Sequence, residues 1–204
     1  MNNRATKQWS KARIPYGYLR EHILSKSQNS YYGLTCIDLL MVANFKGGSA
    51  TIAEPSGYLK EKLQSYSKIL SEIGDKFAED KLGNLPDDSF CHLLQFASSF
   101  CELTKSSETK IDGFGPSFAS ALLNAYFPNL LPILDKRGLN GASIKGVETS
   151  NEGQVKSIES YYQDLIRYFR GRLQQDETIS LEQIDENIFG MELDEKYLPL
   201  RRRE

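Results

Sequence analysis

Apolar residues recur at intervals of three and four along almost the whole chain, and this helical period is the feature that most constrains the fold. The repeat is clearest in residues 56–74, where it runs through Leu59, Leu63, Tyr66, Leu70 and Ile73. The same pattern predicts helices over 34–45, 86–103, about 154–174 and 180–190. No segment alternates strictly enough to predict a strand. The sequence therefore predicts an all-α protein.

Helix end signals support these boundaries. Thr35 stands near the start of the 34–45 pattern as an N-cap, and Gly47 and Gly48 follow the pattern as a stop. Ser180 and Gln183 have the spacing of a capping box, and Gly190 is a stop signal for the same helix. These two predicted helices therefore have residues that can satisfy their terminal backbone groups or end them.

The length of 204 residues suits one domain, which we expect to span 1–204 and to be divided into two helical lobes. Two glycine-containing segments have the composition of linkers, "KGGSATIAEPSG" at 46–57 and "GASIKGVETSNEGQ" at 141–154. We expect the first and last segments to pack together. A cleft is expected near residues 110–145.

The net charge of −2 conceals an uneven distribution. Residues 1–30 carry six Lys or Arg and one acid, whereas residues 176–195 carry eight acids and neither Lys nor Arg. The first segment is either a solvated basic arm or a contact surface for a polyanion. No apolar run is long enough to span a bilayer, so we expect a cytoplasmic protein without membrane contact.

The cysteines and histidines show no metal-binding pattern. We interpret Cys36, Cys91 and Cys101 as small buried hydrophobic residues, and we expect no disulfide, metal or iron–sulfur cluster. His22 and His92 are isolated from any carboxylate or cysteine pattern and are assigned no site. No cofactor is predicted.

The stretch "IDGFGPSFASALLNAYFPNLLPILDKR" at 111–137 predicts a sharp corner followed by a helix. Gly113 and Gly115 allow a tight turn, Phe114 between them is expected to fill the core, and Pro116 suits the first position of a helix. Backbone N–H groups at a helix start can bind a phosphate. The turn is therefore either a plain helical corner or an anion site.

The helix after this corner is expected to gather large and small apolar residues on one face. Its apolar face is predicted to contain Phe118, Ala121, Leu122, Ala125 and Tyr126, with the small residues Ser117 and Ser120 on other faces.

Asp135 ends the apolar run "FPNLLPILD", whose Leu131, Ile133 and Leu134 are expected to pack. It is predicted either to cap the next helix or to present a rigid carboxylate at the mouth of a cleft. The two roles are compatible.

Over about residues 108–140 the chain resembles the helix-hairpin-helix DNA glycosylases, whose pattern is a "G-x-G" hairpin, a small residue and a later "P-x-D". Gly113, Gly115 and Ala119 match the hairpin part, and "LPILD" supplies the aspartate, Asp135. Ser117 stands at the position where the bifunctional members have a lysine, eighteen residues before Asp135. The resemblance is specific over this range and only suggestive in the rest of the chain.

The resemblance implies a monofunctional glycosylase that hydrolyses the N-glycosidic bond of a base flipped out of duplex DNA. Asp135 would stabilise the positive charge that develops on the sugar and orient water. Gly113, Gly115 and Ser117 would bind phosphate, as would Arg137 and its neighbour Lys136. Serine cannot form the Schiff base of the bifunctional members, so no strand cleavage is expected.

We expect a monomer that acts either in DNA repair or in defence against phage DNA with modified bases. Weaker candidates for the DNA surface are Lys145 and the basic N-terminal segment, for phosphate contact, and four aromatic residues for stacking on a base: Trp9, Tyr31, Tyr32 and Tyr126. Aromatic residues at these spacings more often serve ordinary packing in the core or at the surface.

Two alternatives remain open. In the first, the chain is a non-catalytic module that binds DNA through the hairpin, and Asp135 only caps a helix. In the second, the hairpin is simply a corner of a helical protein that does not bind DNA.

Overall fold

The computed structural model describes residues 3–47 and 51–188, with side chains from Ser10 onward except that of Ala12. This part of the chain is all-α, as predicted, and contains only two isolated β-bridges. Its helices are α1 (Asn3–Leu24), α2 (Cys36–Lys46), α3 (Ser56–Phe77), α4 (Asp87–Glu102), α5 (Pro116–Tyr126), α6 (Lys136–Gly141) and α7 (Tyr162–Gln175), followed by a helix at 181–188. Short 3₁₀ turns lie at η1 (Gln28–Ser30), η2 (Leu82–Asn84) and η3 (Ile158–Tyr161).

Helices α2, α3 and α4 form where the apolar period predicts them. The five apolar residues named for α3 are all buried. The Thr35 N–H donates to the Asp38 carboxylate (2.7 Å) at the start of α2, and Gly47 ends that helix with φ 65°. The second glycine of that predicted stop, Gly48, lies outside the described residues. These caps satisfy backbone groups that the helix itself leaves unpaired.

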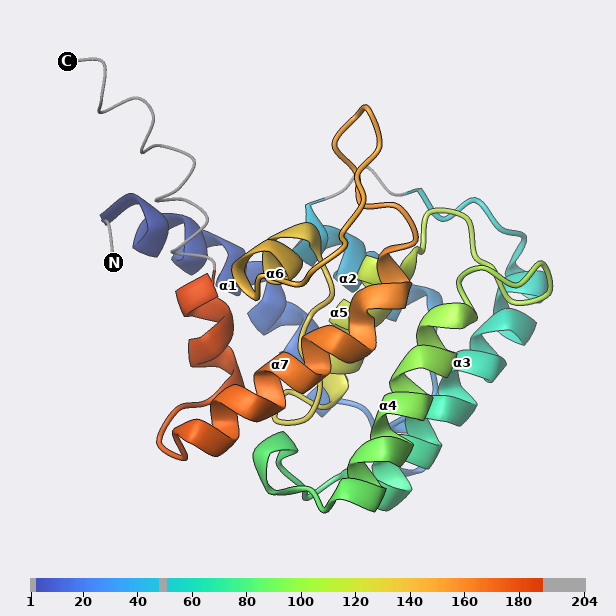
Figure 1. Cartoon of the computed structure of the whole chain (residues 1–204). Coiled ribbons are helices and arrows are strands. Elements are labelled where there is room, and N and C mark those ends of the chain that lie inside the picture. Colours follow the sequence, from blue (N-terminus) through green and yellow to red (C-terminus); the bar gives the residue numbers. More distant parts are fainter. Residues whose placement is uncertain (1–2, 48–50, 189–204) are drawn as a thin grey trace.

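Helix α5 lies at the centre of the fold and contacts α1, α2 and α4. In Figure 1, α7 crosses in front of α5, while α3 and α4 lie side by side at one edge. Every residue from Ala119 to Tyr126 is buried, including the polar Ser120 and Asn124. The burial of α5 therefore extends beyond the apolar face predicted for it, because neighbouring helices surround this helix and cover its polar faces as well.

The first segment is a helix, so its interpretation as a solvated basic arm is wrong. Leu19 and Ile23 of α1 are fully buried, and Tyr16 packs against the core one turn earlier. These residues recur at helical spacing, so burial of one face stabilises α1 despite its basic residues. Arg13 of α1 pairs with Glu182 (2.6 Å), which confirms that the first and last segments pack together. Figure 1 shows α1 beside the helix at 181–188.

The predicted helix over 154–174 starts later than expected. Helix α7 begins at Tyr162, and the 3₁₀ turn η3 precedes it. Residues 148–156 form a projecting hairpin closed by the Lys156 N–H donating to the Glu148 carbonyl (2.9 Å; Figure 1). Ser157 then takes a left-handed conformation with φ 44°, which prevents a continuous helix from forming through it.

The last described helix has the predicted start. The Ser180 N–H donates to the Gln183 side chain (2.7 Å), and the Gln183 N–H donates to the Ser180 hydroxyl (3.1 Å). These reciprocal bonds are a capping box. The predicted stop at Gly190 lies outside the described residues.

The buried apolar side chains form one contiguous cluster. Cys101 belongs to it, but Cys36 and Cys91 are exposed, so the prediction of burial is wrong for these two. Both lie on the solvent side of their helices, a position that a cysteine tolerates because it is small. Within the described segments, no helix combines the length and apolar character required to cross a bilayer.

Candidate active site

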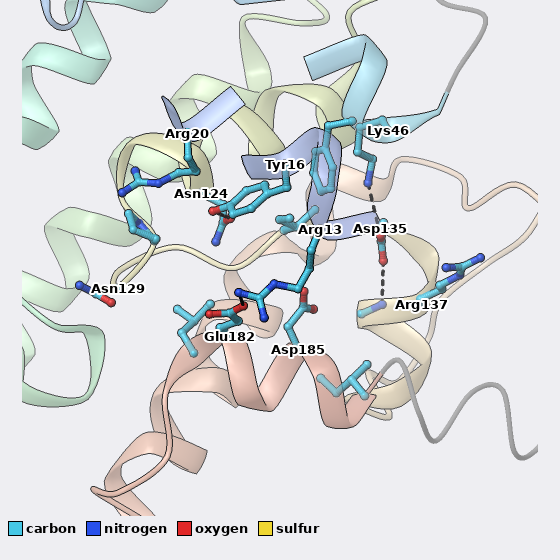
Figure 2. A pocket seen from close by; sticks show the side chains of 16 residues that line it. Arg13, Tyr16, Arg20, Lys46, Asn124, Asn129, Asp135, Arg137, Glu182 and Asp185 are labelled. Carbon is cyan, nitrogen blue, oxygen red and sulfur yellow. Dashed lines mark hydrogen bonds and ion pairs between the residues drawn. The ribbon is translucent and has the colours of Figure 1, made fainter. Parts of the chain in front are cut away.

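A pocket of about 580 Å³ lies where the N-terminal helix, the end of α2, the segment around α6 and the helix at 181–188 meet (Figure 2). This volume falls in the range of small-molecule sites in proteins. Its lining residues come from five segments of the chain: Arg13, Tyr16 and Arg20; Phe45 and Lys46; Asn124, Pro128, Asn129 and Ile133; Asp135, Arg137 and Gly138; and Leu181, Glu182, Asp185 and Ile188. The cleft expected near 110–145 is thus present, and residues outside that range complete it.

Asp135 lies in the wall of this pocket and also caps α6. Its Oδ1 accepts a hydrogen bond from the Gly138 N–H (2.8 Å), which is the predicted N-cap geometry. Its Oδ2 lies 3.3 Å from the Lys46 Nζ. The Asp135 side chain is 36% exposed and that of Lys46 is 14% exposed. One carboxylate oxygen is therefore fixed by backbone, while the other meets a cation inside the pocket.

Buried polar side chains hold the segment that leads to Asp135. The Ser120 hydroxyl accepts from the Leu134 N–H (2.8 Å), and the Asn124 amide donates to the Leu131 carbonyl (2.7 Å). The Tyr162 hydroxyl donates to the Pro132 carbonyl (2.9 Å). This extended segment has no helix or sheet partners, so the three side chains satisfy its buried backbone and fix its course.

The charges in the pocket are mostly paired. Lys46 faces Asp135, and Arg13 bonds Glu182 across the gap between α1 and the helix at 181–188 (Figure 2). Asp185 is different: burial, together with the negative charge of Asp135, raises the pKa of its carboxyl to about 7, and Lys46 offsets part of this rise. Asp135 and Asp185 are therefore carboxyl groups of one pocket in unlike environments.

Tyr16 and Arg20 form the side of the pocket nearest α5. The Tyr16 hydroxyl donates to the Asn124 side-chain oxygen (2.6 Å), and the Arg20 guanidinium donates to the Ala125 carbonyl at the end of α5. Burial raises the pKa of the Tyr16 hydroxyl well above its usual range, so this group stays protonated. These bonds join α1 to α5.

The glycine turn has the predicted local geometry. Gly113 has φ 82°, Gly115 is the N-cap of α5, and Pro116 occupies its first position. Phe114 is buried and packs edge-on against Tyr66, with ring centroids 5.6 Å apart. The prediction that Phe114 fills the core is confirmed.

The surroundings of this turn set its possible contacts. A side chain at Gly113 would come 2.9 Å from the Thr51 carbonyl, so this close approach is to the protein's own backbone. A side chain at Gly115 would meet no atom of the described residues within 4 Å, so that side is open. Helix α4 ends at Glu102, and residues 103–110 separate it from the turn. The turn itself does not line the pocket.

The predicted basic residues lie in different places. Arg137 lines the pocket, whereas the Lys136 Nζ donates to the Gly153 carbonyl (2.8 Å) on the projecting hairpin. Lys145 is exposed and lies outside the pocket lining. Ser117 is partly buried near the start of α5, where its carbonyl accepts from the Ser120 hydroxyl (3.0 Å).

Sequence reasoning missed most of the residues that complete the pocket. Arg13, Lys46 and Asp185 lie far from the 111–137 stretch in sequence and meet Asp135 only through the packing of α1, α2 and the helix at 181–188. A weak signal existed, because the basic first segment and the acidic last segment were expected to pack together.

His22 is not isolated from carboxylates, contrary to the sequence interpretation. Its Nε2 lies 3.3 Å from the buried Asp38 carboxylate, which also binds the Lys26 Nζ (2.6 Å). Lys26 donates as well to the Tyr126 hydroxyl (2.7 Å). This cluster joins α1 to α2 and α5 away from the pocket. Among the described residues, no three metal-ligating side chains are grouped to hold an ion.

The aromatic candidates for base stacking pack against one another. The Tyr31 ring meets those of Tyr32 and Tyr126 at centroid distances of 5.0 and 5.7 Å, and Tyr32 stacks on Phe127 at 6.0 Å. Tyr126 is buried. Their contacts are those of ordinary packing. The side chain of Trp9 lies outside the described part of the structure.

We compared the chain with protein-family models, with curated proteins and with solved structures, and none of the three comparisons found a match. The resemblance to the helix-hairpin-helix glycosylases therefore rests on residues 108–140 alone.

Proposed function

We propose that this chain is a monofunctional DNA glycosylase that hydrolyses the N-glycosidic bond of a flipped damaged or modified base. The observation that carries the proposal is the position of Asp135, whose carboxylate is held by the Gly138 N–H while it faces a pocket of about 580 Å³. A carboxylate fixed in a pocket is what cleavage of this bond requires. The two-lobed helix-hairpin-helix architecture of that family is part of the proposal.

The reaction places positive charge on the sugar as the bond to the base breaks. Asp135 would stabilise this charge through the oxygen that now faces Lys46, and it would accept a proton from the attacking water. Lys46 compensates the carboxylate charge before the nucleotide enters. Ser117 has no amine to attack the sugar, so the product would be an abasic site in an uncut strand.

The DNA backbone would contact the start of α5 and the residues after Asp135. The open side of Gly115 and the backbone N–H groups in the first turn of α5, which contains Ser117, suit a phosphate. Gly113 would shape the glycine turn that precedes this helix. Arg137 supplies a cation at the pocket, and Lys136 would contact the strand beside it. A flipped nucleotide from duplex DNA would place its sugar next to Asp135.

The cellular role of the proposed enzyme is either repair of damaged bases or defence against phage DNA that carries modified bases. In both roles we expect a cytoplasmic monomer. The chemistry at Asp135 is the same for the two, and the identity of the released base decides between them.

A non-catalytic DNA-binding module is the second candidate, and one observation favours it. Both carboxylate oxygens of Asp135 already have partners, Gly138 and Lys46, as a purely structural cap would. Such a module would bind DNA through the same turn and release no base.

The test is mass spectrometry of free bases after incubation of the purified protein with duplexes of damaged bases and with phage genomic DNAs. The proposal predicts release of at least one base, leaving an abasic site without strand cleavage on a denaturing gel. Binding of the same duplexes without release of any base would favour the module instead.

A further inference from the structure

Asp185 stands out among the three acidic side chains that line the pocket. Asp135 pairs with Lys46 and Glu182 pairs with Arg13, but no described residue forms a hydrogen bond or ion pair with the Asp185 carboxyl. Figure 2 shows its side chain pointing from the helix at 181–188 into the pocket. This partly buried carboxyl group is therefore available to a molecule that enters the pocket.

Charged groups from four parts of the chain line the pocket together with Asp185. Arg13 and Arg20 lie on α1, Lys46 on α2, Asp135 and Arg137 at the start of α6, and Glu182 on its own helix. Burial and the charge of Asp135 raise the pKa of the Asp185 carboxyl to about 7, against the opposing effect of Lys46. Near neutral pH, Asp185 can therefore be present as a carboxylic acid, which can donate a proton.

We propose that Asp185 is the proton donor to the departing base, and that the substrate is consequently a base that is neutral in DNA. This inference rests on the proposed function. Asp135 and Asp185 would have different roles in one reaction. Asp135 would act as a carboxylate beside the sugar, and Asp185 would act as an acid beside the base.

The step balances without a cofactor. The bond between C1′ and the base nitrogen breaks, and its electron pair stays on the base, which takes the proton of the Asp185 carboxyl. Water attacks C1′ and gives a proton to the Asp135 carboxylate. Transfer of that proton to solvent and reprotonation of Asp185 restore the starting state, so the net reaction consumes one water.

This assignment narrows the substrate class. A neutral base leaves poorly as an anion, so a proton donor accelerates its departure. A base made cationic by alkylation of a ring nitrogen already carries the positive charge and leaves without an acid. Oxidised, deaminated or enlarged neutral bases are therefore expected substrates, and cationic alkylated bases are not expected to need Asp185.

The experiment measures single-turnover base release from duplexes that contain uracil, hypoxanthine, 8-oxoguanine or the cationic 7-methylguanine, between pH 5 and pH 9. Wild type is compared with Asp185→Asn, Asp185→Glu and the control Glu186→Gln. Glu186 lies on the same helix but does not line the pocket. Thermal melting and DNA binding are measured for each variant, so that a folding defect is recognised.

For a neutral base, the wild-type rate should fall as pH rises through about 7, because the acid form of Asp185 is lost. Asp185→Asn should lower the rate at pH 6 by roughly a hundredfold to ten-thousandfold and abolish this decline. Asp185→Glu should restore part of the rate, and Glu186→Gln should resemble wild type.

The assignment is overturned if Asp185→Asn retains the wild-type rate and alkaline decline, or if wild type releases only the cationic base. Equal loss on neutral and cationic bases would indicate a structural role and would also overturn it. Absence of release by wild type from every duplex would instead reject the proposed function, and this inference with it.

Discussion

The glycine turn at 111–115 and the pocket around Asp135 come from one short stretch of sequence, yet they are built in different ways. The turn depends on local residues: Gly113 takes a left-handed conformation, Pro116 starts α5, and Phe114 enters the core. The pocket instead joins five segments, from Arg13 near the N-terminus to Ile188. Local rules therefore determine the turn, whereas helix packing determines the pocket.

This difference shows which kind of feature can be predicted from a short stretch of sequence. A turn needs particular backbone angles, and few residue types supply them. A pocket needs only that suitable side chains converge, and many sequences can achieve that. The two regions are physically joined by Ser120, which links the first turns of α5 to Leu134, the residue before Asp135. Variants at the turn, at this link and at the pocket test how independent the regions are.

The largest effect on stability is expected at the turn. Phe114→Ala removes a buried ring that packs against Tyr66, so it should lower the free energy of unfolding by about 3–5 kcal/mol. Urea denaturation measures the change. Phe118→Ala is the matched control and should cost less, because Phe118 is only partly buried. Equal costs for the two would contradict the account of the turn as a corner held by Phe114.

The link between the regions should show an intermediate effect. Ser120→Ala leaves the buried Leu134 N–H without its acceptor and should destabilise the fold by about 1–3 kcal/mol. Ser117→Ala, which removes a hydroxyl that makes no hydrogen bond to the described residues, should change stability by less than about 0.5 kcal/mol. Thermal unfolding of both variants gives the comparison. A neutral Ser120→Ala would mean that the segment before Asp135 is held without this bond.

The smallest effect is expected for a basic residue at the pocket. Arg137→Ala should weaken duplex binding and reduce the slope of log K against log salt by about one, as loss of one phosphate contact does. Arg167→Ala, which removes an exposed cation on α7 that pairs with Asp164, is the control. Fluorescence anisotropy at several salt concentrations measures both. An unchanged slope for Arg137→Ala would show that Arg137 does not contact a DNA phosphate.

The fold could be predicted from the sequence largely because helices are specified by local residue patterns. The α3 period, the Thr35 cap and the Ser180–Gln183 box each depend on residues within one or two turns. Helix α1 was missed because its basic residues hid the spacing of Tyr16, Leu19 and Ile23. The start of α7 was misplaced because nothing in the spacing signals the left-handed Ser157.

The candidate site could be predicted only in part, for a related reason. Asp135 was found because its neighbours in sequence make it an N-cap after an apolar run. Lys46, Asp185 and Arg13 belong to other helices, and their distance from Asp135 depends on how those helices pack. Sequence spacing carries no information about that packing without relatives to compare. The paired charges of the pocket are therefore a finding of the structure.

The most direct test of the central claim is the rate of base release by Asp135→Asn and Asp135→Ser, measured on a duplex that wild type processes. Asn and Ser are both good N-caps, so α6 and DNA binding should be retained. We predict that both variants bind DNA as wild type does and release base roughly a hundredfold to ten-thousandfold more slowly, because neither has a carboxylate. Release at the wild-type rate by either variant would contradict it and leave Asp135 as a helix cap alone.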